Sequence, residues 1–293
     1  MSHMSISKLT LALLASALCS QGALAGLVVT TSTDGTSLAT SLLSGGGGVS
    51  ISNVALTGAA TQQGTFTGGV SAGIGIDSGV ILTSGNANLA PGPNNNDGAT
   101  GVSGTGADAD LNTLVGGTTF DKNVLEFDFS TTSGDLFFKY VFASEEYNEY
   151  VNTSFNDVFA FFVDGINIAL IPGTATPVAI NNVNCGGPVF GSSPSNCSQF
   201  NNNDNQDGGP FFDIQYDGFT DVFTASALGL GAGTHHIKLA IADRSDDILD
   251  SAVFLQAGSF SDTNPDDNTI PEPATLALLG LGLAGLGAMR RKA

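Results

Sequence analysis

Residues 124–129 read Val-Leu-Glu-Phe-Asp-Phe, residues 136–142 read Leu-Phe-Phe-Lys-Tyr-Val-Phe, and residues 158–163 read Val-Phe-Ala-Phe-Phe-Val. In the first segment Leu125, Phe127 and Phe129 alternate with acidic residues, while Val124 is out of phase with them. Alternation with a period of two is typical of a strand with one buried face, and short apolar runs of this length suit strands better than helices. The three segments therefore predict strands at the centre of a β fold.

Strand patterns continue on both sides of this centre. Turns rich in Gly, Asn and Pro separate them, including the loop of residues 91–100. Short strands with such turns indicate an all-β fold, an antiparallel β-sandwich of jelly-roll type. The further strands are predicted at residues 49–54, 79–83, 169–171, 211–216, 219–225, 236–242 and 251–260.

Two short helices are expected before the central strands. Residues 36–44 place leucines at helical spacing, with Asp34 or Thr36 as the cap and the glycines at 45–48 as the stop. Residues 108–114 predict a single helical turn.

Both chain ends predict export. Lys8, an apolar stretch and an Ala23-Leu24-Ala25 site form a signal peptide over residues 1–25. At the other end Pro271, Glu272 and Pro273 precede a 16-residue apolar run and then Arg290, Arg291 and Lys292. That run is short against the roughly 20 residues of a full membrane span, and the basic cap is expected on the cytoplasmic side.

This tail resembles the PEP-CTERM sorting signal of Gram-negative bacteria. The resemblance implies that an exosortase is a partner, that a short transmembrane helix anchors the protein transiently in the inner membrane, and that the protein then reaches the cell surface or the exterior. Export through Sec follows from the signal peptide. The predicted organisation is a signal peptide (1–25), one sandwich domain (26–262), a linker (263–270) and the sorting signal (271–293).

The part between the two targeting segments is strongly acidic. Residues 26–270 contain four basic and 26 acidic side chains. Such a surface excludes nucleic acid as a partner, because binding phosphate requires a cationic face. It suits divalent cations or solubility outside the cell, and composition does not separate the two.

Two cysteines remain once Cys19 is removed with the signal peptide. Cys185 and Cys197 flank a loop rich in Gly, Asn, Ser and Pro, which in an oxidising compartment predicts a disulfide. The alternative, a metal-binding or reactive thiol pair, has no histidine neighbour in the sequence.

The middle of the chain resembles the choice-of-anchor L family. The resemblance is carried by Phe-Ala-Ser-Glu-Glu-Tyr-Asn-Glu-Tyr at 142–150 and by Phe-Asn-Asp-Val-Phe-Ala-Phe-Phe-Val-Asp-Gly at 155–165, with supporting matches at 90–94, 241–243 and 250–255. It extends over most of residues 37–260. It implies a surface location and a fold, since the family's name refers to the different anchoring signals of its members.

Acidic residues gather in two segments that could meet around Ca²⁺. Glu145 and Glu146 are adjacent, so on an extended strand they point to opposite faces. Ca²⁺ takes about six to eight oxygen ligands, which loops carrying carboxylates and amides can supply. The predicted Ca²⁺ ligands are Glu145, Glu146, Asn156, Asp157, Asp243, Asp247 and Asp250.

Other roles for these polar residues stay open. Asp and Asn also build turns by bonding their own backbone, and Glu145 could serve a purely structural role. Arg244 could pair with one carboxylate of the second segment. Asp108 and Asp110 form a third acidic group with the loop of residues 94–97, and the Asn-rich tract 201–208 is interpreted as a flexible insertion.

No catalytic residue is assigned. The sequence contains no P-loop, and His235 and His236 are too few for a three-histidine zinc site. Carboxylates about 5–9 Å apart could do glycosidase chemistry. Tyr147 and Tyr150 could stack on a sugar ring or pack on the sandwich.

The sequence thus predicts a non-enzymatic, exported surface or extracellular-matrix protein, stabilised by Ca²⁺ and acting in adhesion or biofilm. Exopolysaccharide or other surface proteins are the expected partners. The alternatives are a carbohydrate-binding, lectin-like module and a hydrolase of matrix polysaccharide.

Overall fold

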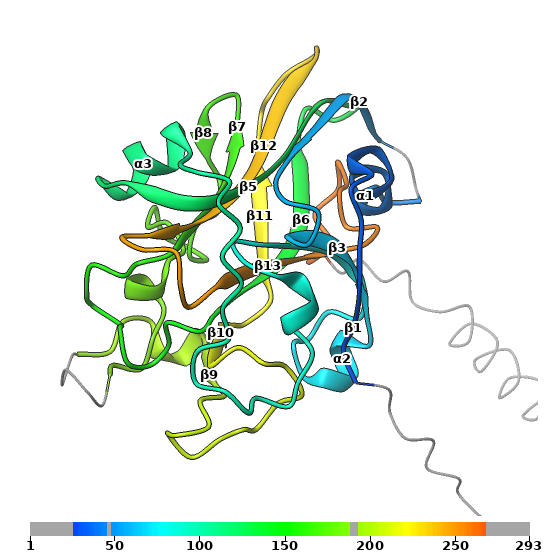
Figure 1. Cartoon of the computed structure of the whole chain (residues 1–293). Helices are drawn as coiled ribbons and strands as arrows, with labels where there is room; N and C mark the ends of the chain where they lie inside the picture. Colours follow the sequence, from blue (N-terminus) through cyan, green and yellow to red (C-terminus); the bar gives the residue numbers. More distant parts are fainter. Residues whose placement is uncertain (1–25, 46–47, 188–192, 268–293) are drawn as a thin grey trace, which may run out of the picture.

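Two antiparallel β-sheets pack face to face in the computed structural model, which describes residues 26–45, 48–187 and 193–267 (Figure 1). The larger sheet has the order β1-β3-β4-β13-β6-β10-β9, with β11 paired to β6 as its eighth strand, and the smaller sheet has the order β2-β5-β12-β7-β8. The predicted all-β sandwich is confirmed. The strands are β1 Val28–Thr31, β2 Val49–Thr57, β3 Gln63–Thr67, β4 Gly79–Thr83, β5 Thr119–Thr131, β6 Leu136–Ser144, β7 Val158–Val163, β8 Ile166–Asn167, β9 Phe200–Asn202, β10 Gly218–Thr220, β11 Phe223–Ala227, β12 His235–Arg244 and β13 Ser251–Gln256.

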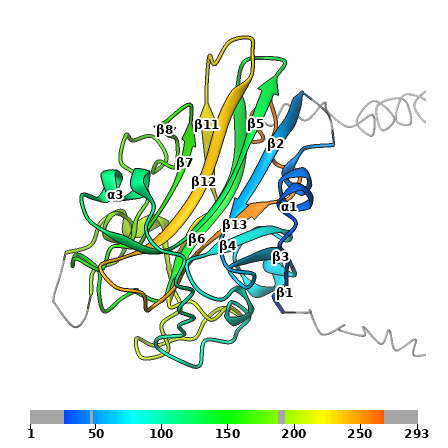
Figure 2. The same cartoon turned by 45° about the horizontal axis from the view of Figure 1, so that its top comes forward.

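The two helices expected from the sequence are present, and each begins after an aspartate cap. Before α1, Asp34 Oδ1 accepts a hydrogen bond from the Ser37 N–H at 3.0 Å, and before α3, Asp108 Oδ1 accepts from the Leu111 N–H at 3.0 Å. Helix α1 lies beside β2 and α3 lies over β7 and β12 (Figures 1 and 2). The helices are α1 Gly35–Leu42, α2 Gly69–Ala72 and α3 Ala109–Val115, and the 3-10 turns are η1 Ala87–Leu89, η2 Ile180–Asn182 and η3 Cys197–Gln199.

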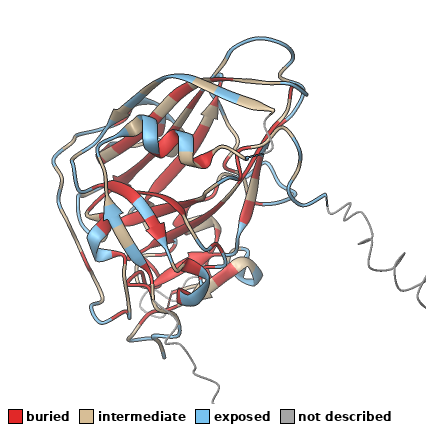
Figure 3. Ribbon diagram, turned by 90° about the vertical axis from the view of Figure 1, so that its right-hand side faces the viewer, coloured by how far each residue is buried: buried red, intermediate tan, exposed pale blue. Residues whose placement is uncertain are grey.

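Phenylalanine fills the space between the sheets. Phe138 of the larger sheet stacks on Phe260 with ring centroids 4.2 Å apart and meets Phe161 of the smaller sheet at 4.9 Å. Phe142 stacks in the same way on Phe159, at 4.9 Å. Figure 3 shows the buried residues concentrated on the strands and the exposed ones on helix faces and loops.

Both sheets are also covered on parts of their outer faces, which explains strands that are buried throughout. On β4, Val80 and Leu82 belong to the core between the sheets, while Ile81 belongs to a second apolar cluster on the other face. Val124 packs in a third cluster with Leu111 of α3, on the opposite side of β5 from Leu125. The out-of-phase position of Val124 in the sequence therefore reflects an outer face covered by a helix.

Four predicted strands are wrong in detail, and one of them, predicted at residues 251–260, is β13 and ends at Gln256. Residues 211–216 form no strand, because the Asn203 side chain takes up their backbone groups: its Oδ1 accepts from the N–H groups of Phe211 and Phe212, and its Nδ2 donates to the carbonyls of Ile214 and Tyr216. Residues 219–225 divide between β10 and β11, which pair with different parts of β6. Residues 169–171 contribute only an isolated bridge at Leu170, and the strand after β7 is β8.

The targeting segments predicted from the sequence (1–25 and 271–293, with Pro271, Glu272, Pro273, Arg290 and Arg291) lie outside the described residues. Among the described residues no helix combines the length and the hydrophobicity that crossing a membrane requires.

Replacing Phe161 with alanine should reduce the free energy of unfolding by about 3–5 kcal/mol, because it leaves a cavity between the sheets. The fully buried ring contacts Phe138 and Tyr140 at 4.9 Å each. The matched control is Phe211→Ala, since Phe211 is 62% exposed and its loss should cost within about 0.5 kcal/mol. Urea unfolding measures both, and equal losses would contradict this account of the core.

Candidate metal centre

The pairing of the strands brings carboxylates together at one end of the larger sheet. Ser144, the last residue of β6, pairs with the first residue of β10 on one side and with the first residue of β13 on the other. In antiparallel pairing the residue that follows on one strand lies opposite the residue that precedes on its partner. Glu145 therefore lies between Asp217 and Asp250, and its N–H donates to the Asp250 carbonyl at 3.1 Å.

The smaller sheet repeats this arrangement at the same end. Ala242 of β12 pairs with Val158 of β7, so Asp243 lies next to Asp157, which precedes β7. Asp157 Oδ1 accepts from the Arg244 N–H at 2.9 Å, and Asp157 Oδ2 accepts from Ser251 Oγ of the larger sheet at 2.7 Å. The carboxylates of the two sheets thus meet.

Glu145 and Glu146 face different neighbours, as their adjacency predicted. The negative charges that act on Glu145 are those of Asp217 and Asp250, whereas those acting on Glu146 come from Asp157, Asp246 and Glu149. Each glutamate of the dipeptide thus has its own nearest carboxylates, and the two groups adjoin, since Asp97 and Asp204 also act on Glu149 and Asp250 also acts on Asp243.

A carboxylate trio lies on the Glu145 side. Oxygen atoms of Asp97, Asp204 and Asp217 lie within 4.8 Å of one another. Asp204 and Asp217 are fully buried, and each has an Oδ2 atom that meets no hydrogen-bond partner among the described residues, as does Asp97 Oδ1. The three residues come from the loop after η1, the turn after β9 and the residue before β10.

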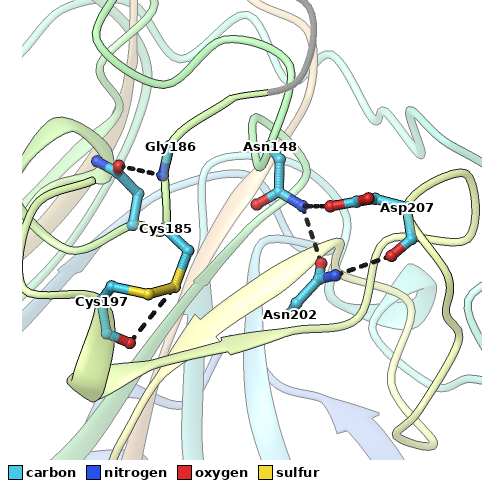
Figure 4. Close-up of a disulfide and its surroundings, with 7 residues drawn as sticks. Asn148, Cys185, Gly186, Cys197, Asn202 and Asp207 are labelled. Carbon is cyan, nitrogen blue, oxygen red and sulfur yellow. Dashed lines mark hydrogen bonds between the residues drawn. A yellow bond between two sulfur atoms is a disulfide. The ribbon is translucent and has the colours of Figure 1, made fainter. Parts of the chain in front are cut away.

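Amide side chains hold the trio in place. Asn94 Nδ2 donates to Asp217 Oδ1 at 2.5 Å, and Gln206 Nε2 donates to Asp97 Oδ2, while the Gln206 backbone N–H donates to Asp204 Oδ1 at 2.6 Å. Asn148 Nδ2 donates to Asn202 Oδ1 at 2.9 Å, which ties the segment after β6 to the Asn-rich loop (Figure 4). Asn148 Oδ1 is buried without a partner among the described residues, so it is one more oxygen available to a ligand.

A disulfide lies just before the Asn-rich loop of residues 201–208. Cys185 and Cys197 are bonded, next to the bridge between Asn184 and Ser195 (Figure 4). Cys197 starts η3, which leads directly into β9. The crosslink therefore limits the freedom of the segment that carries Asp204.

Protein cations do not neutralise this acidic end. Within the described ranges no Lys, Arg or His forms an ion pair with any of its carboxylates. The Arg244 guanidinium, expected to pair with a carboxylate, instead donates to the Ser154 carbonyl and to Ser245 Oγ. The ten carboxylates of this acidic end are those of Asp97, Glu145, Glu146, Glu149, Asp157, Asp204, Asp217, Asp243, Asp246 and Asp250.

Burial and mutual repulsion raise the pKa values of these groups. Burial, followed by the neighbouring carboxylates, raises the pKa of Asp217 to about 8 and that of Glu146 to about 10. Burial likewise raises the pKa of Asp157 and of Asp250 to about 7. Without added positive charge this end therefore favours protonated carboxyls, and a bound cation would reverse that preference.

Five of the seven predicted Ca²⁺ ligands are buried at the acidic end, whereas Asn156 and Asp247 are not available to an ion there. Glu145, Glu146, Asp157, Asp243 and Asp250 are buried there. Asn156 uses its Oδ1 to accept from the Asn181 N–H at 2.9 Å, which is a structural role, and Asp247 is exposed. The two predicted acidic segments do come together, while metal binding itself stays a prediction.

Sequence reasoning missed the carboxylate trio. The tract 201–208 is no flexible insertion at its start, since Asn203 and Asp204 are fully buried. The third acidic group was misplaced as well, because Asp108 and Asp110 both bind the Lys238 ammonium at 2.7 Å. The available signal was a run of Asn and Asp next to a predicted strand, which is also the signal of an ordinary turn.

The two tyrosines considered as a sugar platform pack on the protein. Tyr147 is fully buried, with its ring 4.7 Å from that of Phe200. Tyr150 is half-buried and meets the Phe155 ring at 5.5 Å.

Comparison with family models places the chain among exported surface proteins. The choice-of-anchor L domain matches residues 28–261, and the PEP-CTERM protein-sorting motif matches residues 269–292. The chain belongs to the choice-of-anchor L domain family. The motif implies recognition by exosortase and processing at the membrane for the cell surface or exterior, and both matches are features of surface-protein sorting and not of enzymes. No curated protein and no solved structure matches the chain.

In a chelator, the melting temperature of the exported protein should fall between pH 5 and pH 8. A carboxyl whose pKa is raised on folding stabilises the fold fully below its unfolded pKa of about 4, and that contribution is lost as the pH rises through the folded pKa. With folded pKa values of about 7 for Asp157 and about 8 for Asp217, most of their contribution is lost by pH 8, while that of Glu146, with a pKa of about 10, continues to fall above it. Scanning calorimetry at constant ionic strength measures it; a melting temperature that stays level or rises over this window would contradict the raised values.

Proposed function

We propose that the protein is a non-enzymatic surface or matrix component whose sandwich is stabilised by Ca²⁺ at the carboxylate trio. The observation that carries the proposal is the convergence of Asp97, Asp204 and Asp217 from three separate segments, with oxygens within 4.8 Å of one another. Two oxygens bound to one Ca²⁺ at about 2.3–2.6 Å lie no more than about 5 Å apart. The spacing of the trio suits a shared ion.

The donor atoms favour Ca²⁺ over other metals. The trio offers carboxylate oxygens alone, which suit a hard cation, whereas zinc and copper sites use histidine or cysteine. Two further oxygens are available: Glu145 Oε2, on the residue beside Asp217, and Asn148 Oδ1 are both buried without partners among the described residues. Ca²⁺ accepts about six to eight such ligands in flexible geometry, while Mg²⁺ requires a near-ideal octahedron and keeps its waters.

An ion at the trio would rigidify the loop end of the domain. It would connect the loop of Asp97 with the turn after β9 and with the start of β10. These segments are held together otherwise by amide hydrogen bonds such as that from Asn94 to Asp217. In the absence of the ion, the repulsion between the three carboxylates acts against these bonds.

Adhesion or biofilm formation is the role that fits this picture. A surface protein with 26 acidic and four basic residues between positions 26 and 270 could bind acidic exopolysaccharide or another surface protein through bridging Ca²⁺. Export through Sec and sorting in a Gram-negative envelope belong to the same proposal, supported by the sorting motif. The burial of Tyr147 speaks against the lectin-like alternative, because its ring offers no face to a sugar.

Excess Ca²⁺ should raise the melting temperature of the exported protein relative to chelator. A site at 100 times its dissociation constant adds about 2.7 kcal/mol, or about 5–10 °C for a domain of this size. The variants Asp204→Asn and Asp217→Asn should lose most of this shift, while Asp77→Asn, at an exposed position, should keep it. Wild-type protein without a shift, or trio variants with the full shift, would contradict the proposal.

A further inference from the structure

We propose that a second divalent cation binds on the opposite side of the Glu145-Glu146 dipeptide, held by Glu146, Asp157, Asp243 and Asp246. This second carboxylate group shares no residue with the trio and is less tightly gathered: no three of its residues bring oxygens within 4.8 Å of one another, so the ion would draw the side chains together. The inference rests on the proposed function only for the choice of Ca²⁺ as the ion.

Buried carboxylate oxygens of this second group have no hydrogen-bond donor in the described part of the chain. Glu146 and Asp243 are both fully buried. Both carboxylate oxygens of each residue meet no hydrogen-bond partner among the described residues, and neither does Asp246 Oδ1. All of these atoms are acceptors, so they require donors or a cation.

The donors near these atoms bring no charge: burial raises the pKa of Asp243, and the Ser84 hydroxyl, which acts to lower it, is neutral. The one basic side chain on the adjoining segment, Arg244, donates its guanidinium to the Ser154 carbonyl and to Ser245 Oγ. A water molecule can donate two hydrogen bonds but brings no charge. Protonation neutralises a carboxylate at one oxygen, and the other oxygen still has no hydrogen-bond donor. A divalent cation satisfies several oxygens together and offsets two charges.

Hydroxyl groups hold Glu146 and Asp157 in position. Ser144 Oγ accepts from the Glu146 N–H at 2.9 Å and lies 2.8 Å from Ser251 Oγ. Ser251 Oγ in turn lies 2.7 Å from Asp157 Oδ2. This chain fixes the backbone of Glu146 and the side chain of Asp157 relative to each other, and the pairing of β7 with β12 fixes Asp243 next to Asp157.

The second ion would act between the sheets. Glu146 follows β6 of the larger sheet, whereas Asp157 and Asp243 belong to the ends of β7 and β12 in the smaller one. The trio, in contrast, connects loops attached to the larger sheet. Because Glu146 is adjacent to Glu145, which lies beside Asp217 of the trio, an ion at either site orders backbone that adjoins the other, so binding at the two sites should be cooperative.

Native mass spectrometry and calorimetric titration with Ca²⁺ test the proposal on the exported protein. Wild-type protein and the exposed control Asp77→Asn should each bind two ions. Glu146→Gln and Asp243→Asn should bind one, Asp204→Asn should bind one, and the double variant Asp204→Asn/Asp243→Asn should bind none. Circular dichroism checks that each variant is folded, and Asp246→Asn, at a partly exposed loop position, provides a mild second variant that should bind the second ion at least tenfold more weakly.

The outcomes separate this proposal from the first one. One ion in wild type, lost in Asp204→Asn and kept in Glu146→Gln, would overturn the second site and leave the trio standing. Two ions retained in folded Glu146→Gln and Asp243→Asn would also overturn it. One ion in wild type that is lost in Glu146→Gln but kept in Asp204→Asn would support the second site and overturn the trio, and no ion in wild type would overturn both.

Discussion

Repulsion among buried carboxylates is the constraint on which this domain depends. Taking a charge out of water is costly unless a partner of opposite sign accompanies it. Seven of the ten carboxylates at the acidic end are buried, and no described basic side chain pairs with them. The strands cannot pair in their register without bringing these groups together, because Glu145, Asp217 and Asp250 are fixed by the same ladder that holds β6, β10 and β13. The folded state therefore needs protons or cations from its surroundings.

Burial of the apolar core stabilises the fold against the repulsion among these carboxylates. Stacked phenylalanines such as Phe138 with Phe260 and Phe142 with Phe159 hold the two sheets in one register. Outer clusters under α3 and under the loops add burial on the far faces. The apolar core thus determines the fold. The sorting motif directs the protein to the cell surface, and ions present outside the cell would determine how rigid the loop end of the domain is.

The sequence predicted those features that depend on local pattern. The alternation in residues 124–129, the short helices near residues 36–44 and 108–114, and the two acidic segments around Glu145 and Asp243 each have a local physical cause. Asp217 escaped prediction because its position beside Glu145 depends on pairing between strands 74 residues apart in the chain. Residues 211–216 escaped because a single side chain, that of Asn203, replaces the backbone partners that a strand would use. Neither the register between distant strands nor a side chain that bonds backbone groups in place of a strand leaves a periodic pattern in the sequence.

Anomalous diffraction from crystals of the exported protein grown with Ca²⁺ tests the central claim most directly. The account predicts an anomalous peak about 2.3–2.6 Å from carboxylate oxygens of Asp97, Asp204 and Asp217, and another among Glu146, Asp157 and Asp243. The contrary result is a map without either peak, in which water or protonated carboxyl pairs satisfy these oxygens. In that case the acidic end would be neutralised by protons, and Ca²⁺ would have no structural part in this surface protein.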